Sequence, residues 1–456
     1  MSYIWLISLV AAMGGLLFGW DWVVIGGAKP FFERYFNLTS ESQIGWANSC
    51  ALIGCLVGSI AAGPLSDKCG RKRLLIVSAI IFAITSLGNA LATTFDLFIM
   101  WRMLGGVAIG LSSGLSPMYI SEVAPAQIRG RLVSLNQLTI VIGILAAQFI
   151  NWYLVRELPP GATDEFIRTS WFGQMGWRWM FGITSIPAVF FFLGMFLVPE
   201  SPRWLIKNGK IDSAFNILKK IGGNEYAVAE TKEIQTTLAK EETGNADFKD
   251  LLDPKLRRVL TLGIVLAVFQ QWCGINVIFN YAEEIFKAAG YDISTVLKNI
   301  AWTGSVLLVF TFVALGLVDK IGRRPLMLMG AIGLTIIYSI LGLCYMNNVQ
   351  GWPVLLLVLS AIACYAMSMA PITWVIISEI FPNRIRGTAV SISVSALWIA
   401  CFLLTYSFPI LNAKLGSSGT FFIYAIICAT GFIFIFCKLP ETKGKSLEDI
   451  EKELVN

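Results

Sequence analysis

Long apolar segments constrain this chain more than any other feature of its sequence. Twelve can be drawn, and each reaches the roughly 20 residues that a helix needs to cross a hydrocarbon layer about 30 Å thick. The first begins at Ile4 with no basic region before it, so we expect a span there and not a secretory signal. We place the twelve at 4–27, 43–64, 74–93, 96–118, 132–153, 177–198, 257–281, 297–318, 326–346, 352–377, 387–411 and 419–438.

Composition agrees with a chain that faces lipid. The sequence is 56% hydrophobic and 14% charged, with a mean hydropathy of +0.70, whereas soluble domains average about 25% charged residues. Backbone groups in lipid must be satisfied within a helix or a closed barrel, and these segments lack the two-residue alternation of barrel strands. The sequence therefore predicts an all-α membrane protein with 12 transmembrane helices embedded in the lipid bilayer.

Lysine and arginine are distributed unevenly among the segments between the spans. If the amino terminus is cytoplasmic, 26 of the 35 Lys and Arg residues fall on the inner side, as the positive-inside rule predicts. We therefore expect a multi-pass protein of the cell (inner) membrane with both termini cytoplasmic. The net charge of +6 then reflects topology, and because no soluble basic face is evident we expect no nucleic-acid partner.

The reactive residue types argue against an enzyme. The chain has nine cysteines and no histidine. No CxxC pair occurs, and all the cysteines except Cys69 lie in apolar spans, so we expect small core residues and no disulfides. No metal cluster, nucleophile–base pair or phosphate loop is evident, so we expect no cofactor and no metal. Proton chemistry near neutral pH then requires a carboxylate.

Three charged motifs occur twice, at the same step in each half of the chain. They follow spans 2 and 8, close spans 4 and 10, and follow spans 6 and 12, at 67–72 and 319–324, 121–130 and 378–387, and 199–200 and 440–441. Both copies are expected on the cytoplasmic side, which indicates two six-helix units repeated in parallel.

This repeat predicts four regions in the chain. They are an N-terminal six-helix bundle at 1–198, a cytoplasmic helical linker at 199–256, a C-terminal six-helix bundle at 257–438 and a short cytoplasmic tail at 439–456. Apolar residues recur at helical spacing within the linker, which favours amphipathic helices there. A linker without regular structure is the alternative.

Six motifs in this order carry a resemblance to the sugar porters of the major facilitator superfamily, and within it to the bacterial xylose carriers. They are GLLFGWD at 15–21, GRKR at 70–73, PESPR at 199–203, QQ with GIN at 270–276, GRR at 322–324 and PETKGK at 440–445. The resemblance covers nearly the whole chain, from about Gly14 to Leu447. It implies the major facilitator fold and the transport of a small sugar by a protein that we expect to be a monomer.

The resemblance also implies a cytoplasmic gate built from the charges of the repeated motifs. Exposed ion pairs contribute only about 0–1 kcal/mol each, so a network of them could hold one state without freezing it. The alternative is that these charges only set topology. The gate residues are Asp67, Arg71, Glu122, Arg129, Glu200 and Arg203 in the first half and Asp319, Arg323, Glu379, Arg386 and Glu441 in the second.

Asp21 and Arg102 are the clearest charges placed well inside predicted spans. Each lies about six residues from the outer end of its span, or roughly 9 Å deep at 1.5 Å per residue. Ionised residues at such depth usually pair and often mark a transport pathway. By resemblance Asp21 is the proton-coupling group, whereas Thr184 stands where the xylose carriers have a glutamate linked to coupling. The alternative is a static structural ion pair.

A sugar pocket needs amides for the hydroxyls and aromatic rings for the C–H faces. The pair Gln270 and Gln271 lies near the middle of the seventh span, where transporters of this kind bind substrate. The positions that match sugar contacts by resemblance are Phe18, Gln137, Gln270, Gln271, Asn276, Asn280, Trp374 and Trp398. The alternatives are hydrogen bonding between helices for the glutamines, and packing or an interfacial belt for the tryptophans.

Four of the matched positions depart from the xylose carriers. Where those have polar or tyrosine side chains, this chain has Ile144, Asn280, Leu307 and Leu397. A hydroxyl left unpaired against an aliphatic side chain costs about 1–3 kcal/mol. We therefore expect a substrate preference different from that of D-xylose carriers, or a differently posed sugar.

Two of the spans are expected to bend. Gly274 follows the glutamines in the seventh span, and Pro371, which lacks a backbone donor, lies in the tenth. Both are candidates for local gates, with simple kinks as the alternative.

Three functions remain open from the sequence. Proton-coupled symport of a monosaccharide, a pentose or a hexose, is favoured by Asp21, and a facilitative sugar uniporter is the alternative. A non-transporting sugar sensor usually carries a long signalling tail, whereas about 18 residues follow the last span here.

Overall fold

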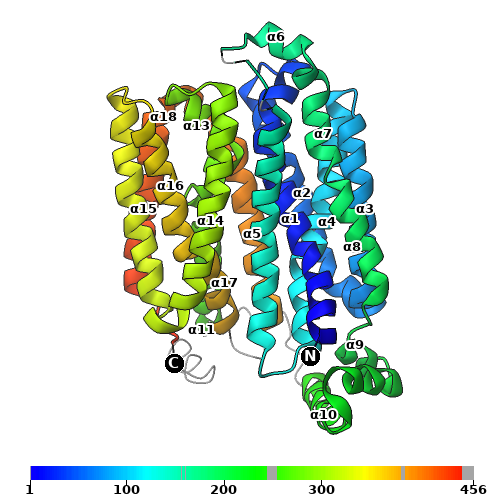
Figure 1. The fold of residues 1–456 in the computed structure, drawn as a ribbon. Coiled ribbons are helices and arrows are strands. Elements are labelled where there is room, and N and C mark those ends of the chain that lie inside the picture. Colours follow the sequence, from blue (N-terminus) through cyan, green and yellow to red (C-terminus); the bar gives the residue numbers. More distant parts are fainter. Residues whose placement is uncertain (1, 156, 160, 244–253, 382–385, 444–456) are drawn as a thin grey trace. The chain divides into compact units, whose positions relative to one another are not determined.

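The computed structural model describes the chain except residues 1, 156, 160, 244–253, 382–385 and 444–456 (Figure 1). The described residues form helices and no strands. The helices are α1 Ser2–Tyr35, α2 Glu41–Cys69, α3 Arg71–Leu91, α4 Phe95–Val123, α5 Arg129–Val155, α6 Asp164–Thr169, η1 Phe172–Gly176, α7 Trp177–Gly182, α8 Ser185–Leu197, α9 Pro202–Lys207, α10 Ile211–Thr243, α11 Pro254–Trp272, α12 Ile275–Asn280, α13 Ala282–Ala288, α14 Ile293–Ile321, α15 Arg323–Met346, α16 Trp352–Met367, α17 Met369–Glu379 and α18 Arg386–Lys438.

Contacts divide the chain into two compact units that interleave along the sequence. Unit 1 comprises Met1–Trp22, Ile53–Ile144 and Phe181–Ala246, and unit 2 comprises Val23–Leu52, Leu145–Met180 and Asp247–Asn456. The second half of α1 therefore belongs to the same unit as the carboxy-terminal helices. The expected division into bundles at 1–198 and 257–438 stays a prediction.

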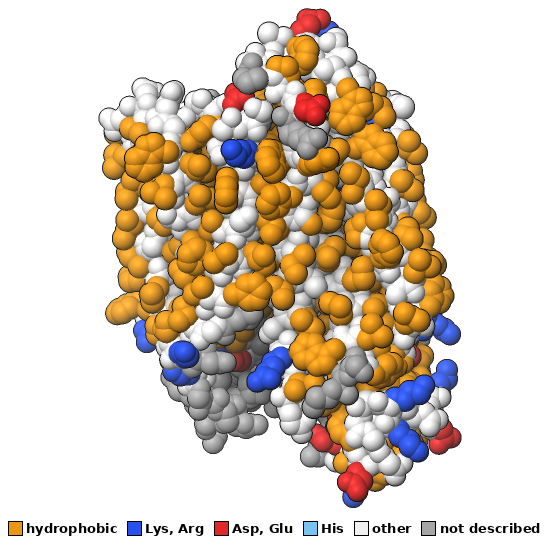
Figure 2. Space-filling view, viewed as in Figure 1, with side chains coloured by type: hydrophobic (Ala, Val, Ile, Leu, Met, Phe, Trp, Pro, Cys, Tyr) orange, Lys and Arg blue, Asp and Glu red, His pale blue; other side chains and the backbone are white. Residues whose placement is uncertain are grey.

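The long helices have the composition of membrane spans. Among the described residues, 11 helical stretches are long and apolar enough to cross a membrane. The last of them, Thr388–Lys438, has 51 residues and is broken at Gly416 (φ 66°), so it accounts for two of the 12 expected spans. Figure 2 shows hydrophobic side chains over the middle of the helices and most of the charged ones toward their ends. Exposed large apolar residues such as Leu91 (73%) and Leu197 (67%) suit a lipid surface and not water.

Helix α1 is longer than the sequence predicted. The expected span ended at residue 27, whereas the helix continues to Tyr35 and so includes Lys29, Glu33 and Arg34. Charged residues normally mark the end of a span, but these three are paired with other charges of unit 2. The expectation that Asp21 and Arg102 are the clearest intramembrane charges therefore overlooked Lys29.

The seventh and tenth spans are both interrupted, as the sequence predicted. Helix α11 ends at Trp272, and α12 begins after Gly274, whose φ of 87° is a left-handed conformation that favours glycine. Helices α16 and α17 meet at Ser368 (φ −123°, ψ −88°), three residues before Pro371. The break precedes the proline because a proline cannot donate to the carbonyl four residues earlier.

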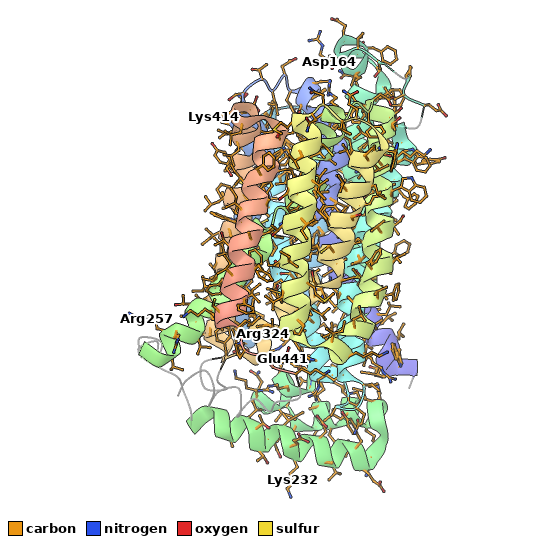
Figure 3. All side chains as sticks on the ribbon, turned by 90° about the vertical axis from the view of Figure 1, so that its left-hand side faces the viewer. Asp164, Lys232, Arg257, Arg324, Lys414 and Glu441 are labelled. Atoms are coloured by element: carbon orange, nitrogen blue, oxygen red, sulfur yellow. The ribbon has the colours of Figure 1, made fainter. Side chains whose placement is uncertain are left out.

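The described part of the expected linker is helical. Helix α9 packs against α10 through buried Trp204, Leu205, Ile206 and Ala214, with half-buried Ile217, Ile234 and Leu238 around them. Helix α10 changes direction at Gly223, which has a φ of 89°. Lys232 lies on its exposed face (Figure 3). The alternative of an irregular linker therefore does not apply to α9 and α10.

Candidate functional site

A chain of buried amides lies where α11 gives way to α12. Gln270 Nε2 donates to the hydroxyl of Tyr365 at 3.1 Å, and Gln271 Nε2 donates to Gln270 Oε1 at 2.6 Å. Asn276 Nδ2 in turn donates to Gln271 Oε1. The two glutamines and Asn276 are 4%, 6% and 7% exposed. All four residues belong to unit 2, and the turn at Gly274 folds Asn276 back toward the glutamines.

Three more of the predicted sugar contacts belong to unit 2 and lie on α12, α17 and α18. Asn280 ends α12 and is 4% exposed, and its Oδ1 has no hydrogen-bond partner among the described residues. An unsatisfied buried amide oxygen is costly unless a ligand or water uses it. Trp398 on α18 is 3% exposed, whereas Trp374 on α17 is 41% exposed. Trp374 is thus the predicted contact in this unit that is least enclosed.

The remaining predicted contacts lie in unit 1. Phe18 and Gln137 are half-buried on α1 and α5, and the ring of Phe18 lies edge-on to Trp22 at 5.8 Å between centroids. The three aliphatic departures, Ile144, Leu307 and Leu397, are 8%, 5% and 2% exposed. All three aliphatic side chains are therefore enclosed by protein in this structure.

Asp21 and Arg102 pair inside unit 1. Arg102 Nη1 donates to Asp21 Oδ2 at 2.9 Å, and the two side chains are 3% and 7% exposed. The Arg102 guanidinium also lies 5.5 Å from the ring centre of Phe181, while its Nε has no partner among the described residues. A buried pair with one open donor is less satisfied than a structural pair usually is.

Thr184 lies three residues after Phe181, next to the start of α8. It is 1% exposed, and its hydroxyl has no hydrogen-bond partner in the described part of the chain. A threonine cannot exchange a proton near neutral pH. Of Asp21, Arg102 and Thr184 in unit 1, Asp21 is therefore the buried residue whose side chain can bind a proton.

The first charge network joins the ends of α2, α3 and α4 to the segment after α8 in unit 1. Arg71 contacts Asp67 Oδ1 at 3.2 Å and Glu122 Oε1 at 3.0 Å. Glu200 Oε1 accepts backbone N–H groups of Arg71 and Lys72 at 2.9 and 3.1 Å. The expectation of exposed ion pairs is wrong for Arg71, which is 7% exposed. Removing one partner of a buried pair costs more than breaking an exposed one, because a charge is left without compensation.

The second network in unit 2 repeats this arrangement. Arg323 Nη2 contacts Glu379 Oε1 at 3.3 Å, and Glu441 accepts the backbone N–H groups of Arg323 and Arg324 at 3.0 and 3.1 Å. Glu441 lies close to Arg324 (Figure 3). Although burial opposes the shift, backbone donors, with that of Lys443 the strongest, lower the pKa of Glu441.

The motif glycines explain why both networks close in the same way. Gly70 and Gly322 have φ values of 94° and 105°, and an added Cβ would lie 2.3 and 2.8 Å from the carboxylates of Glu200 and Glu441. Only glycine leaves room for the carboxylate to reach the helix start. The remaining gate residues are Arg129, whose Nε donates to the Ala124 carbonyl at 3.4 Å, Arg203 on α9, and Asp319 and Arg386, whose side chains lie outside the described residues.

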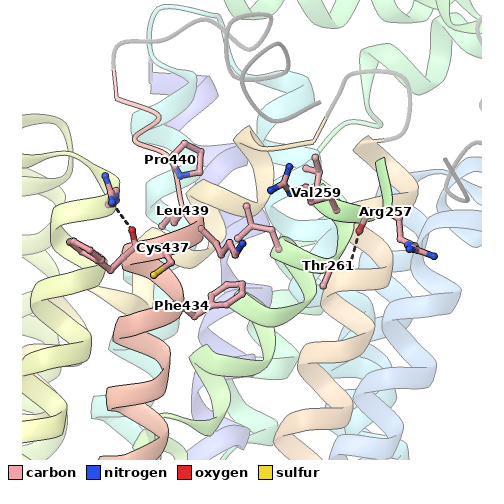
Figure 4. A pocket seen from close by; sticks show the side chains of 12 residues that line it. Arg257, Val259, Thr261, Phe434, Cys437, Leu439 and Pro440 are labelled. Atoms are coloured by element: carbon pink, nitrogen blue, oxygen red, sulfur yellow. Dashed lines mark hydrogen bonds between the residues drawn. The ribbon is translucent and has the colours of Figure 1, made fainter. Parts of the chain in front are cut away.

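A cavity of about 640 Å³ in unit 2 lies near the second network and is distinct from the amide chain. Arg257, Arg258, Arg324 and Lys438 line it, together with apolar side chains of α11 and α18 such as Phe434 (Figure 4). Its lining contains none of the predicted sugar contacts. We therefore do not assign it to the sugar site.

Long apolar helices that enclose buried polar and charged side chains are typical of a multi-pass membrane transporter. Residues 7–454 match the family described as "Sugar (and other) transporter". The chain is 38% identical to the D-xylose-proton symporter of Escherichia coli, with 99% of this chain and 95% of the relative covered. It is 40% identical to the arabinose-proton symporter of Bacillus subtilis, with the same shares covered.

The solved structures agree with the sequence relatives. The chain is similar to the partially occluded inward open conformation of the xylose transporter XylE from E. coli, with a TM-score of 0.86 and 35% identity. That similarity covers 98% of this chain and 100% of the other. The chain belongs to the sugar porter family of the major facilitator superfamily. The predicted family, the all-α major facilitator fold and the prediction of a transporter, not an enzyme, are confirmed.

Sequence reasoning missed two groups of polar residues. Tyr365 was overlooked because a lone tyrosine on an apolar helix gives no pattern, although its hydroxyl accepts a hydrogen bond from Gln270 Nε2. The second group surrounds Lys29 at the far end of α1 from the amino terminus. Its signal was present in the sequence as a lysine two residues beyond the end assigned to the first span.

Proposed function

We propose that this protein is a proton-coupled symporter that carries a monosaccharide, a pentose or a hexose, into the cell by alternating access. The single observation that carries the proposal is the buried Asp21–Arg102 pair. The names of the two relatives, a D-xylose-proton and an arabinose-proton symporter, support both the sugar and the proton.

The coupling step follows from the geometry of that pair. A nearby cation favours the ionised form of a carboxylate, so a protonated Asp21 that meets Arg102 would give up its proton. One charge that moves through 100 mV supplies about 2.3 kcal/mol, enough for roughly fifty-fold accumulation. Asp21 is the proton-binding group in this proposal, and Arg102 is the cation that displaces the proton.

The sugar site in this proposal is the amide chain and its surroundings. Gln270, Gln271 and Asn276 exchange hydrogen bonds among themselves, so a sugar hydroxyl can replace one partner without leaving the others unpaired. Asn280 offers an open acceptor. By family resemblance Trp374 and Trp398 are further sugar contacts of unit 2, and Phe18 and Gln137 are sugar contacts of unit 1. Because Leu307 and Leu397 offer no hydrogen bond, we expect a substrate preference different from that of D-xylose carriers, or a differently posed sugar.

Orientation and organisation complete the proposal. Both termini are cytoplasmic, the protein lies in the inner membrane as a monomer, and the regions 1–198 and 257–438 move against each other. The two charge networks form the cytoplasmic gate. The excess of Lys and Arg in the segments that carry those networks supports this orientation.

A facilitative sugar uniporter is the second candidate, and Thr184 is the observation that favours it. By resemblance, the xylose carriers have a glutamate linked to proton coupling at this position. This chain has a threonine there and so lacks one of the acids that coupling uses in those carriers. Adding sugar to lightly buffered, de-energised cells that contain the protein separates the two functions. A symporter makes the medium alkaline as sugar enters, whereas a uniporter leaves its pH unchanged.

The gate predicts the effect of removing both motif arginines. Arg71→Gln together with Arg323→Gln leaves Glu122 and Glu379 without their cations, so the inward-open state should become more populated. We expect a cysteine introduced on the cytoplasmic side of α17 to react several-fold faster with a thiol reagent applied from that side. Lys219→Gln with Lys220→Gln removes the same charge from the exposed face of α10 and should leave the rate unchanged. Equal rates in both variants would refute the gate.

A further inference from the structure

Lys29 is a fully enclosed cation that the proposed mechanism does not use. It lies in the last two turns of α1, and its side chain is 2% exposed. Its ammonium donates to Glu284 and lies 3.2 Å from Glu33 Oε1 and 3.6 Å from Glu283 Oε2. The ring centre of Tyr281 is 5.6 Å from the same nitrogen. All of these residues belong to unit 2.

A second layer of charges surrounds the first. Arg34 on α1 contacts Asp164 of α6 at 2.8 Å and Glu283 at 3.6 Å, and Lys287 of α13 contacts Glu283 at 2.9 Å. The Lys29 cluster, as we call it, therefore comprises the cations Lys29, Arg34 and Lys287 and the carboxylates Glu33, Asp164, Glu283 and Glu284. It joins three segments of the chain that are distant in sequence.

The cluster lies at the end of unit 2 opposite the second charge network. Figure 3 shows Asp164 at one end of the helices and Arg324 with Glu441 at the other. The two clusters therefore cannot control access to unit 2 from the same side of the membrane. If the motifs lie on the cytoplasmic side, the Lys29 cluster lies on the outer side.

The segment that Lys29 holds carries two amides of the proposed sugar site, Asn276 and Asn280. Helix α13 follows α12 with only Tyr281 between them, and α12 bears Asn276 and Asn280. The α1 backbone touches the same segment, because a Cβ on Gly26 would lie 2.3 Å from the Phe279 carbonyl oxygen. The segment 275–288 thus contacts the second half of α1 at two places, near Gly26 and at Lys29.

That segment is bounded by points where the backbone can turn. Gly274 adopts a left-handed conformation before α12, and Tyr281, with a φ of −124° and a ψ of 30°, interrupts the helix after it. Glycine permits a change of backbone direction that other residues resist. A rotation at Gly274 would carry Asn276, Asn280 and α13 away from α1 together. Such a rotation has to break the contacts of Lys29.

Electrostatics make the cluster depend on Lys29. Despite burial, Lys29 first, and then Lys287 and Arg34, lower the pKa of Glu283, whereas burial, opposed by Lys29 and assisted by Glu283, raises the pKa of Glu284. Without Lys29, Glu33 of α1 would face Glu283 and Glu284 of α13 without the cation that now lies between them. Repulsion between these carboxylates would then favour separation of α13 from α1.

We propose that Lys29 is a positioning residue of the transport cycle, which holds 275–288 closed over the sugar site from the outer side and is released when the site opens outward. This inference rests on the proposed function, since it names the outer counterpart of the cytoplasmic gate. Lys29 needs no contact with sugar or proton to do this. It acts through the position of Asn276 and Asn280.

The test compares Lys29→Gln with Lys29→Arg and with the exchanged pair Lys29→Glu, Glu284→Lys. Each carries Ala282→Cys, a 1% exposed position on α13, and is treated from outside with a thiol reagent that does not cross the membrane. We expect Lys29→Gln to be labelled at least five-fold faster than the parent and to show a several-fold lower turnover in sugar counterflow. Lys29→Arg and the exchanged pair should return both values toward those of the parent.

Controls keep a structural role distinguishable from a positioning one. Lys414→Gln removes an exposed lysine at the same end of unit 2 and should change neither value. Unchanged labelling of a Lys29→Gln protein that elutes as the parent does would overturn the inference. If that variant does not fold, Glu284→Gln removes the strongest partner instead and must show the same increase. Counterflow and labelling need no proton gradient, so a failure of proton coupling would leave this result intact.

Discussion

Replacing Asp21 by asparagine is expected to abolish concentrative sugar uptake while leaving exchange intact. Asparagine keeps the size of the side chain and a hydrogen bond to Arg102, but it cannot bind and release a proton. Accumulation should fall from about fifty-fold at 100 mV to the equilibrium level. The measurement is uptake of labelled sugar by energised vesicles beside counterflow in de-energised ones.

The matched control for this change is Asp96→Asn. Asp96 is an exposed carboxylate in the first turn of α4, the helix that carries Arg102. Its neutralisation changes the net charge equally but should leave accumulation as in the parent. Concentrative uptake that survives Asp21→Asn would contradict the coupling mechanism.

Truncating Gln271 to alanine is expected to weaken sugar binding strongly. Gln271 links Gln270 to Asn276, so its loss leaves an amide of each neighbour without its partner. One unsatisfied buried group costs about 1–3 kcal/mol, which corresponds to a rise in the half-saturating sugar concentration of about 5- to 150-fold. Counterflow at several sugar concentrations measures it.

A surface glutamine tests whether the effect belongs to the amide chain. Gln235→Ala lies on the exposed face of α10 and should leave the half-saturating concentration unchanged. Gln271→Asn retains an amide on a shorter side chain and should fall between alanine and the parent. A folded Gln271→Ala protein with unaltered sugar dependence would remove the amide chain from the binding site.

The helices were predictable because lipid imposes one simple demand on the chain. Every spanning segment has to be apolar for about 20 residues and has to satisfy its own backbone. The kinks were predictable for a related reason, since Gly274 and Pro371 each interrupt an otherwise apolar helix. The break at Ser368 shows that the proline acts on the turn before it.

The end of α1 was not predictable from local sequence. Lys29 reads as the edge of a span until its partner Glu284 is known, and that partner is 255 residues away. Hydropathy averages neighbours along the chain and cannot register a charge that is compensated by a distant segment. Tyr365 was missed for the same reason, because its partner Gln270 is 95 residues away.

For Arg71 the partners were predictable from the sequence, whereas the burial of its side chain was not. Its pairing with Asp67 and Glu122 followed from the repeated motif, but its burial did not. Arg71 is enclosed by partners far apart in sequence, since Glu122 contacts its guanidinium and Glu200 accepts its backbone N–H. A gate built on a buried arginine costs more to open than the sum of exposed pairs suggests.

The most direct test of proton-coupled sugar transport is accumulation of a labelled monosaccharide in proteoliposomes of the purified protein. An inward proton gradient is imposed on one sample, and the same sample is repeated with a protonophore. We expect accumulation well above the outside concentration only while the gradient lasts, with equilibration alone when the protonophore is present. Equal sugar levels with and without the gradient would contradict symport and leave a uniporter.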